Sequence, residues 1–320
     1  MVSLQTRMFL LVAALFAIVY MIIVLIGTSM GYNDFYFYLI ISLGLMWIQY
    51  MVGPKIIEWS MKLRYIERQD NPKLWSMVEE MCHRGNIPMP RLCIAPTAVP
   101  NAFAFGRGVK DGRVCVSEGI LKLLNEEEIK AVLGHELTHL KNRDVFTITL
   151  LSVIPMILYR VAWHFMWYGG RRDSRNGPSG AVVGIVAFLF YFITNLLVLY
   201  GSRIREYYAD KGAVELGNRP AALASALYKL VYGSARLSRS EEMKQVEGMK
   251  AFFINDPSRA VNEFRELKEL DMDNSGTIDS HELLRLRNSQ INVSGGEKLM
   301  ELLSTHPNML KRIKHLSELK

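Results

Sequence analysis

Apolar residues gather in four long stretches of this chain. Residues 8–30 carry no charge and exceed the roughly 20 helical residues that a bilayer requires. Residues 35–52 and 181–201 are also uncharged, whereas Pro155, Arg160 and His164 interrupt residues 145–168. The pattern predicts a polytopic membrane protein with a retained N-terminal hairpin. The last two stretches have an alternative interpretation, a helical hairpin buried in a soluble domain.

Basic residues orient the first two stretches. They flank the hairpin at Arg7, Lys55, Lys62, Arg64, Arg68 and Lys73, and they are missing from the turn at residues 31–34. Because positive flanks stay in the cytosol, both ends of the hairpin are expected there. Arg171, Arg172 and Arg175 lie between the third and fourth stretches and favour the opposite arrangement, which leaves their crossing open.

The polar segments predict a mainly α structure with a small β-sheet (α+β). Asn71 and Pro72 begin a predicted helix that runs to His83. The segments RLCIA, NAFAFG and RVCVS predict short strands, with GRGVKDG as the turn between the last two. Asn125 caps the next helix, and the chain after residue 201 is mostly helical.

Composition supports a membrane protein in a reducing compartment. Hydrophobic residues make up 50% of the chain, and its formal net charge is +7. Because many Lys and Arg residues lie beside apolar stretches, the charge favours a membrane surface over nucleic acid. The three cysteines, Cys82, Cys93 and Cys115, are odd in number and show no CxxC spacing, which is typical of reduced cytosolic thiols.

The helix from Asn125 contains HELTH, a pattern typical of zinc peptidases. His135 and His139 are four residues apart and therefore share one helix face, as two ligands of one zinc ion require. Glu136 can take a proton from a water molecule that the metal acidifies. The alternative is two surface histidines beside an unrelated glutamate.

A third ligand is expected in REYYAD, where Glu206 and Asp210 are also four residues apart. Glu206 can bind the metal while Asp210 hydrogen-bonds a ligand histidine. HELTH lies just before the third apolar stretch, and Glu206 lies just after the fourth. A membrane hairpin would therefore bring both motifs to the same membrane surface, although Glu206 could instead pair with Arg203.

In this order the motifs resemble the HtpX-type membrane zinc metalloproteases, relatives of the CAAX prenyl endopeptidases. The resemblance implies zinc ligands His135, His139 and Glu206, the general base Glu136, and cleavage of damaged or misfolded membrane proteins. It implies a zincin-like catalytic domain in two parts, residues 55–144 and 202–320. The anchor is residues 1–54, and residues 145–201 form a membrane or membrane-associated hairpin. An inner-membrane protein with a cytosolic active site and protein or peptide substrates is expected.

Two further segments gain a role from the resemblance. NAFAFG is similar to an edge strand beside the cleft, and the expected substrate contacts are Asn101, Ala102, Phe103, Ala104 and Phe105. STHPNMLKRI brings His306 and Arg312 into a pattern that lies near the zinc in relatives, where either can stabilise an oxyanion. An ordinary hairpin strand and a helix cap are the alternatives.

Residues 271–282 depart from that family and match a twelve-residue calcium loop of the EF-hand type. The expected calcium ligands are Asp271, Asp273, Ser275, Thr277, Asp279 and Glu282. Gly276 stands at the sixth position, where the loop turns sharply. One Ca²⁺ is therefore expected beside one Zn²⁺; the alternative is a solvated acidic turn.

Together, the apolar stretches, the motifs and the resemblance predict a membrane-bound zinc endopeptidase. Two other functions remain open: a catalytically inactive calcium-responsive scaffold, and a membrane transporter suggested by the four apolar stretches.

Overall fold

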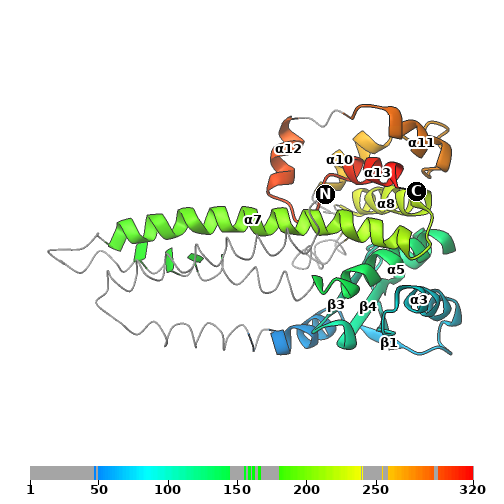
Figure 1. Ribbon diagram of the computed structural model, residues 1–320, viewed down its shortest axis with the longest axis horizontal. Coiled ribbons are helices and arrows are strands. Elements are labelled where there is room, and N and C mark those ends of the chain that lie inside the picture. Colours follow the sequence, from blue (N-terminus) through cyan, green and yellow to red (C-terminus); the bar gives the residue numbers. More distant parts are fainter. Residues whose placement is uncertain are drawn as a thin grey trace. The chain divides into compact units, whose positions relative to one another are not determined.

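The computed structural model describes residues 50–144, 180–238, 259–291 and 295–319, together with residues 47, 155, 158, 159, 161, 162, 165, 166, 240 and 254 (Figure 1). The chain divides into two compact units, one of Met1–Val52 and Phe146–Gly201 and the other of Gly53–Val145 and Ser202–Lys320. We call the second the catalytic unit, after the catalytic domain that the resemblance predicts in residues 55–144 and 202–320. The apolar stretch 8–30, and most of 35–52 and 145–168, lie outside the described residues.

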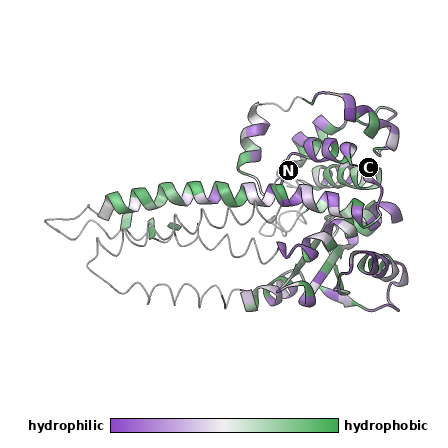
Figure 2. Cartoon of the chain, in the orientation of Figure 1, coloured by the Kyte–Doolittle hydropathy of each residue, from purple (hydrophilic) through white to green (hydrophobic). Residues whose placement is uncertain are grey.

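The fourth apolar stretch is the first part of α7 (Gly180–Glu215), a helix of 36 residues. Among the described helices it is the one long and apolar enough to cross a membrane. Figure 2 shows hydrophobic residues along its first part and hydrophilic residues along its last part. Sequence reasoning ended the apolar element at Gly201, but the helix continues, because one glycine costs a helix only about 1 kcal/mol.

A mixed four-stranded sheet lies in the catalytic unit, with strand order β1-β2-β4-β3. Its strands are β1 (Arg64–Ile66), β2 (Arg91–Ala95), β3 (Ala102–Gly106) and β4 (Gly112–Ser117). β2 and β4 are parallel, and the other two pairs are antiparallel. The three predicted strands are confirmed, whereas β1 is too short to produce an alternating pattern. β3 lies at one edge of the sheet.

The predicted helices of the catalytic unit are also confirmed. They are α3 (Pro72–Gly85), α5 (Glu126–Lys141), α8 (Pro220–Leu237), α10 (Ala260–Leu267), α11 (Ser280–Asn288), α12 (Gly295–Leu302) and α13 (Met309–Glu318). The short helix α4 (Glu118–Leu123) was not predicted. Asn71 and Asn125 cap α3 and α5 as expected, and Glu128 completes a capping box at the start of α5.

Helix α8 fixes the position of α5 in the core. The buried Glu128 of α5 accepts hydrogen bonds from Ser225 Oγ at 2.6 Å and Lys229 Nζ at 2.9 Å, both from α8. Because these partners satisfy a carboxylate that would otherwise be buried at high cost, they hold the start of α5 in place. The helix that carries HELTH is therefore rigidly mounted.

Candidate metal centre

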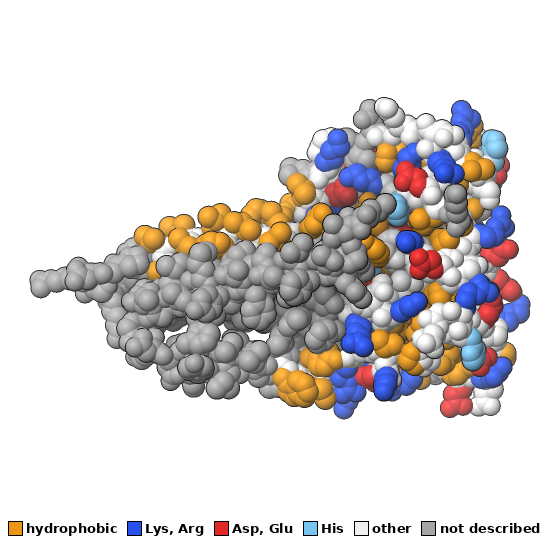
Figure 3. All heavy atoms as spheres, viewed as in Figure 1, with side chains coloured by type: hydrophobic (Ala, Val, Ile, Leu, Met, Phe, Trp, Pro, Cys, Tyr) orange, Lys and Arg blue, Asp and Glu red, His pale blue; other side chains and the backbone are white. Residues whose placement is uncertain are grey.

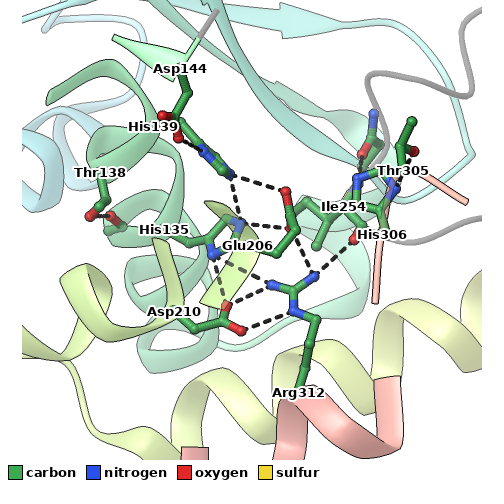
Figure 4. Close-up of polar contacts among 12 residues, drawn as sticks. His135, Thr138, His139, Asp144, Glu206, Asp210, Ile254, Thr305, His306 and Arg312 are labelled. Carbon is green, nitrogen blue, oxygen red and sulfur yellow. Dashed lines mark hydrogen bonds and ion pairs between the residues drawn. The ribbon is translucent and has the colours of Figure 1, made fainter. Parts of the chain in front are cut away.

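Helices α5 and α7 approach each other closely at Gly212. A Cβ atom at this position would lie 2.3 Å from Cγ2 of Thr138, so no larger residue fits there. This contact brings together the α5 face that carries His135 and His139 and the α7 face that carries Glu206 (Figure 4).

Three donor groups converge at this junction. His135 Nε2 lies 3.1 Å from His139 Nε2. Glu206 Oε2 lies 3.5 Å from His135 Nε2, and Glu206 Oε1 lies 3.5 Å from His139 Nε2. One ligand atom from each residue lies within 4.8 Å of the other two. The three residues are thus arranged around one point.

Each histidine is oriented by a carboxylate on its other ring nitrogen. His135 Nδ1 lies 2.9 Å from Asp210 Oδ1, and His139 Nδ1 lies 2.6 Å from Asp144 Oδ2. When Nδ1–H donates to a carboxylate, the Nε2 lone pair remains free for a metal. Both lone pairs then point to the shared centre.

Arg312 contacts the carboxylates of both Asp210 and Glu206. Its side chain is fully buried, and its Nε and Nη2 donate to Asp210 at 2.9 and 2.6 Å. Its Nη1 donates to the Ile254 carbonyl at 3.1 Å and lies 3.1 Å from Glu206 Oε2. Burial lowers the pKa of Arg312, but the Asp210 and Glu206 charges outweigh this and raise it. Arg312 therefore stays charged and braces both carboxylates.

The electrostatics of the centre favour a cation between the imidazoles. Burial lowers the pKa of His135, but the neighbouring Asp210 and Glu206 carboxylates outweigh burial and raise that pKa to about 9. Burial also raises the pKa of Glu136, against the opposing charges of the two histidines. The backbone amide of Ala104 in β3 hydrogen-bonds the Glu136 carboxylate and opposes this shift.

The donor set fits a zinc ion. Two imidazoles and one carboxylate form one of the usual catalytic zinc sets, and they leave a coordination position open. Glu206 Oε2 is buried and accepts no hydrogen bond, although it lies at ion-pair distance from Arg312. A buried acceptor of this kind is suited to a metal ligand.

Of the other predicted residues, His306 and the edge strand also lie near this centre. Figure 4 shows the His306 ring next to the Glu206 carboxylate, and its Nδ1 lies 2.9 Å from Thr305 Oγ1. Asn101 precedes β3, where its side chain accepts a hydrogen bond from Ile254 N at 3.2 Å. Phe103 and Phe105 are buried against each other.

Sequence reasoning missed Asp144 and Arg205. Arg205 Nε forms an ion pair with Asp144 Oδ1 at 2.9 Å, and both residues are buried. Asp144 follows the end of α5 and returns to His139 because Arg143 adopts a left-handed conformation with φ of 57°. The only sequence indication for Asp144 was an acidic residue five positions after His139. That spacing does not predict the left-handed turn at Arg143.

The predicted calcium loop also brings acidic groups together. Ligand atoms of Asp271, Asp273 and Glu282 lie within 4.8 Å of one another. Asp271 accepts hydrogen bonds from the Gly276 amide at 2.9 Å and the Tyr228 hydroxyl at 3.1 Å, and the Gly276 φ is 76°. The loop therefore has the sharp turn that its glycine predicts, and α8 supports its first position.

The remaining predicted calcium ligands have local partners. Ser275 Oγ lies 2.9 Å from Thr277 Oγ1, and Asp279 caps α11 by accepting a hydrogen bond from Glu282 N at 2.8 Å. Ser275 Oγ also lies 3.5 Å from Asp271 Oδ1, which belongs to the group of three acidic residues.

Comparisons with known proteins agree with the metal centre. Residues 68–320 match the sequence profile of Peptidase family M48. The chain belongs to this family. It is therefore a metalloprotease, and M48 metalloproteases use zinc, which the His135, His139 and Glu206 group can hold.

Relatives of this M48 peptidase extend the assignment to the HtpX type. A protease HtpX homolog from Methanothermobacter thermautotrophicus is 47% identical over 72% of this chain and 86% of its own length. One from Moorella thermoacetica is 31% identical over 99% and 94%. With α7 as a candidate span, this M48 peptidase is a membrane metalloprotease, and neither the scaffold nor the transporter is favoured.

A solved structure was also found. The crystal structure of S. mikatae Ste24p covers 98% of this chain and 65% of its own chain, at 16% identity and a TM-score of 0.46. At that score the likeness supports no further conclusion.

Proposed function

We propose that this metalloprotease is a zinc-dependent endopeptidase with His135, His139 and Glu206 as the metal ligands. The convergence of their three donor atoms within 4.8 Å carries the proposal. A bound zinc ion would polarise the scissile carbonyl and lower the pKa of a water molecule. Asp210 and Asp144 hold the ligand imidazoles in the required tautomer.

Glu136 is proposed as the general base. Its raised pKa suits a group that accepts a proton from the attacking water and returns it to the leaving amine. The Ala104 amide holds the carboxylate beside the edge strand. Proton transfer would therefore occur next to the segment proposed to bind substrate.

An extended substrate is proposed to pair with β3 through residues 101–105. β3 is an edge strand, and the Ala104 amide faces Glu136 instead of β4. Pairing through backbone groups would tolerate many side chains, as expected of an enzyme that cleaves misfolded membrane proteins.

The proposed roles of His306 and Arg312 differ. His306, beside Glu206, is proposed to stabilise the oxyanion. The N–H groups of Arg312 contact Asp210, the Ile254 carbonyl and Glu206. Arg312 is therefore proposed to position the metal ligands and not to contact the substrate.

Metal analysis and proteolysis of the same purified samples test the zinc site. His135→Ala, His139→Ala and Glu206→Ala should each lose both zinc and activity. Glu136→Gln should keep its zinc while kcat falls by about 10²- to 10⁴-fold, because it removes the base and no ligand. Full zinc occupancy in Glu206→Ala would exclude Glu206 as the third ligand.

A cytosolic face of the inner membrane is the proposed location of the catalytic unit. Cys82, Cys93 and Cys115 are buried, so they cannot report on sidedness with a thiol reagent. Leu284→Cys introduces a thiol at an exposed position of α11. A membrane-impermeant reagent should label it after lysis but not in intact cells, and labelling of intact cells would reverse the proposed topology.

We also propose that residues 271–282 bind one Ca²⁺ and stabilise the catalytic unit. Asp271 contacts α8 through Tyr228, and Lys314 Nζ of α13 donates to the Leu286 carbonyl at 2.8 Å and the Ser289 carbonyl at 3.1 Å, at the end of α11. Because α13 also carries Arg312, an ordered loop would support the helix that braces the zinc ligands.

A further inference from the structure

Two exposed apolar patches lie on the catalytic unit. The first is Ile56 and Trp59, three residues apart on one face of the helical segment 50–60, where Trp59 is 83% exposed. The second, at the end of α12, is Met300, Leu302 and Leu303. Large apolar side chains gathered in this way are typical of a binding surface.

The first patch is held facing outward by contacts on the opposite side of its helix. Ile57 and Met61 pack against a core cluster that includes Phe103 of the edge strand. Glu58 pairs with the buried Arg113 of β4 at 2.8 Å. The sheet therefore fixes one face of the helix, and Ile56 and Trp59 remain on the other.

The second patch is tied to α7 where the apolar part of that helix ends. Arg203 Nη1 donates to the carbonyls of Glu301 at 2.8 Å, Leu302 at 3.1 Å and Ser304 at 2.8 Å. Arg203 lies two residues after Gly201, so about 3 Å of helix rise separates it from the apolar stretch. The patch therefore lies at the level where α7 would leave a membrane.

We propose that both patches insert into the headgroup boundary of the bilayer that α7 crosses. This rests on the proposed membrane span. Ile56 follows the apolar stretch 35–52 by four residues, and α12 is bound to Arg203 just after the apolar part of α7. Figure 3 shows hydrophobic side chains on both segments. Lys55, Lys62 and Lys298 are exposed close by in sequence and suit anionic headgroups.

The short distance between the second patch and the proposed zinc site bears on the choice of substrate. Glu206 follows Arg203 by three residues, or about 4.5 Å of helix rise. With the patches in the headgroup layer, the proposed zinc site lies about one helical turn along α7 from that layer. The enzyme would then cleave segments of membrane proteins that emerge directly from the bilayer.

Depth-dependent quenching of a thiol-linked fluorophore tests the surface in the full-length protein. The protein is reconstituted in nanodiscs of phosphatidylcholine and phosphatidylglycerol, with nitroxide lipids labelled near the headgroup or deep in the acyl chain. The probes are Trp59→Cys and Leu303→Cys, and the controls are Leu189→Cys in the apolar part of α7 and Leu284→Cys on α11. The three leucines are matched, with exposed fractions of 54% for Leu303, 56% for Leu189 and 58% for Leu284.

Background labelling is low because the native cysteines are buried and burial raises the pKa of Cys82 to about 11. The labels at Trp59 and Leu303 should be quenched more by the shallow nitroxide, and the label at Leu189 more by the deep one. The label at Leu284 should be quenched by neither.

The controls separate three ways in which the proposal can fail. If Leu189 is quenched but Trp59 and Leu303 behave like Leu284, the surface proposal is wrong and the span stands. If Leu189 is not quenched either, the span itself is wrong. If the label at position 303 is shielded from solvent but is quenched by neither nitroxide, then protein covers the patch. That result also overturns the proposal.

Discussion

Asp144 Oδ2 lies 2.6 Å from His139 Nδ1, so the second histidine of the motif has its own carboxylate partner. Arg205 holds the other oxygen of Asp144 at 2.9 Å. The side chain of the residue just before Glu206 thus orients a histidine on another helix. Both imidazoles of the proposed zinc site are therefore oriented by a carboxylate at Nδ1, from Asp210 for His135 and from Asp144 for His139.

Replacing Asp144 by asparagine should weaken zinc binding about 10- to 100-fold. Asparagine keeps the size of the side chain, but it removes the charge that makes the His139 imidazole a stronger ligand. Competition with a chromogenic chelator measures the affinity directly. Asp111→Asn, which removes a carboxylate from an ion pair with Arg91 outside the centre, should leave the affinity unchanged. Equal zinc affinities in the wild type, Asp144→Asn and Asp111→Asn would contradict a role of Asp144 in zinc binding.

Arg312→Leu should destabilise the catalytic unit by about 3 to 5 kcal/mol, because it leaves the fully buried Asp210 without its cation. The thermal midpoint in detergent measures the change. Arg91→Leu is the matched control, since the half-exposed Arg91 pairs with Asp111 and its loss should cost at most about 1 kcal/mol. Similar shifts for the two variants would show that Asp210 does not need Arg312.

The local part of the site was predictable from sequence because the spacing of His135, Glu136 and His139 fixes their relative positions on one helix. Glu206 was predictable only by combining its helical spacing to Asp210 with the apolar stretches. Asp144 was not predictable, because its position depends on the left-handed Arg143, and no sequence rule requires a bulky basic residue to adopt that conformation.

In the fold, too, local elements were predictable from the sequence, whereas features that depend on distant contacts were not. Strands β2, β3 and β4 have alternating or apolar patterns bounded by turn residues, and each was predicted. Their order was not, because the parallel pairing of β2 with β4 makes β3 an edge strand through contacts distant in sequence. The continuity of α7 through Gly201 was likewise missed, since a polar segment after an apolar one suggests a boundary.

Ala104→Pro should lower kcat/KM about 10- to 100-fold with little change in the thermal midpoint. The Ala104 amide bonds to Glu136 and not to β4, and proline is tolerated on an edge strand whose N–H faces away from the sheet. Loss of a hydrogen bond to a charged group typically costs about 1.5 to 3 kcal/mol, which accounts for the range. Ala104→Gly keeps the amide and should retain most activity. Wild-type kcat/KM in Ala104→Pro would argue against any role of this amide.

Calcium should raise the thermal midpoint of the protein, because a ligand that binds only the folded state stabilises it by linkage. At a calcium concentration 100 times the Kd, the expected stabilisation is about 2.7 kcal/mol. The double variant Asp271→Asn, Glu282→Gln should lose this increase, since it removes charge from two of the three converging groups. Asp271 also accepts bonds from Tyr228 and Gly276, so the variant starts from a lower midpoint. The quantity to compare is therefore the calcium-dependent increase in each protein.

Glu269→Gln controls for charge, because it removes an exposed carboxylate just before the loop and leaves the converging group intact. It should keep the full calcium response. An equal response in the double variant would locate calcium elsewhere, and no response in the wild type would mean that the loop is only a capped acidic turn. Proteolysis measured in parallel separates two uses of the site. A calcium-dependent rate at a temperature well below both midpoints would mean that the loop acts on the zinc centre through α13, whereas an unchanged rate there would limit calcium to stabilisation.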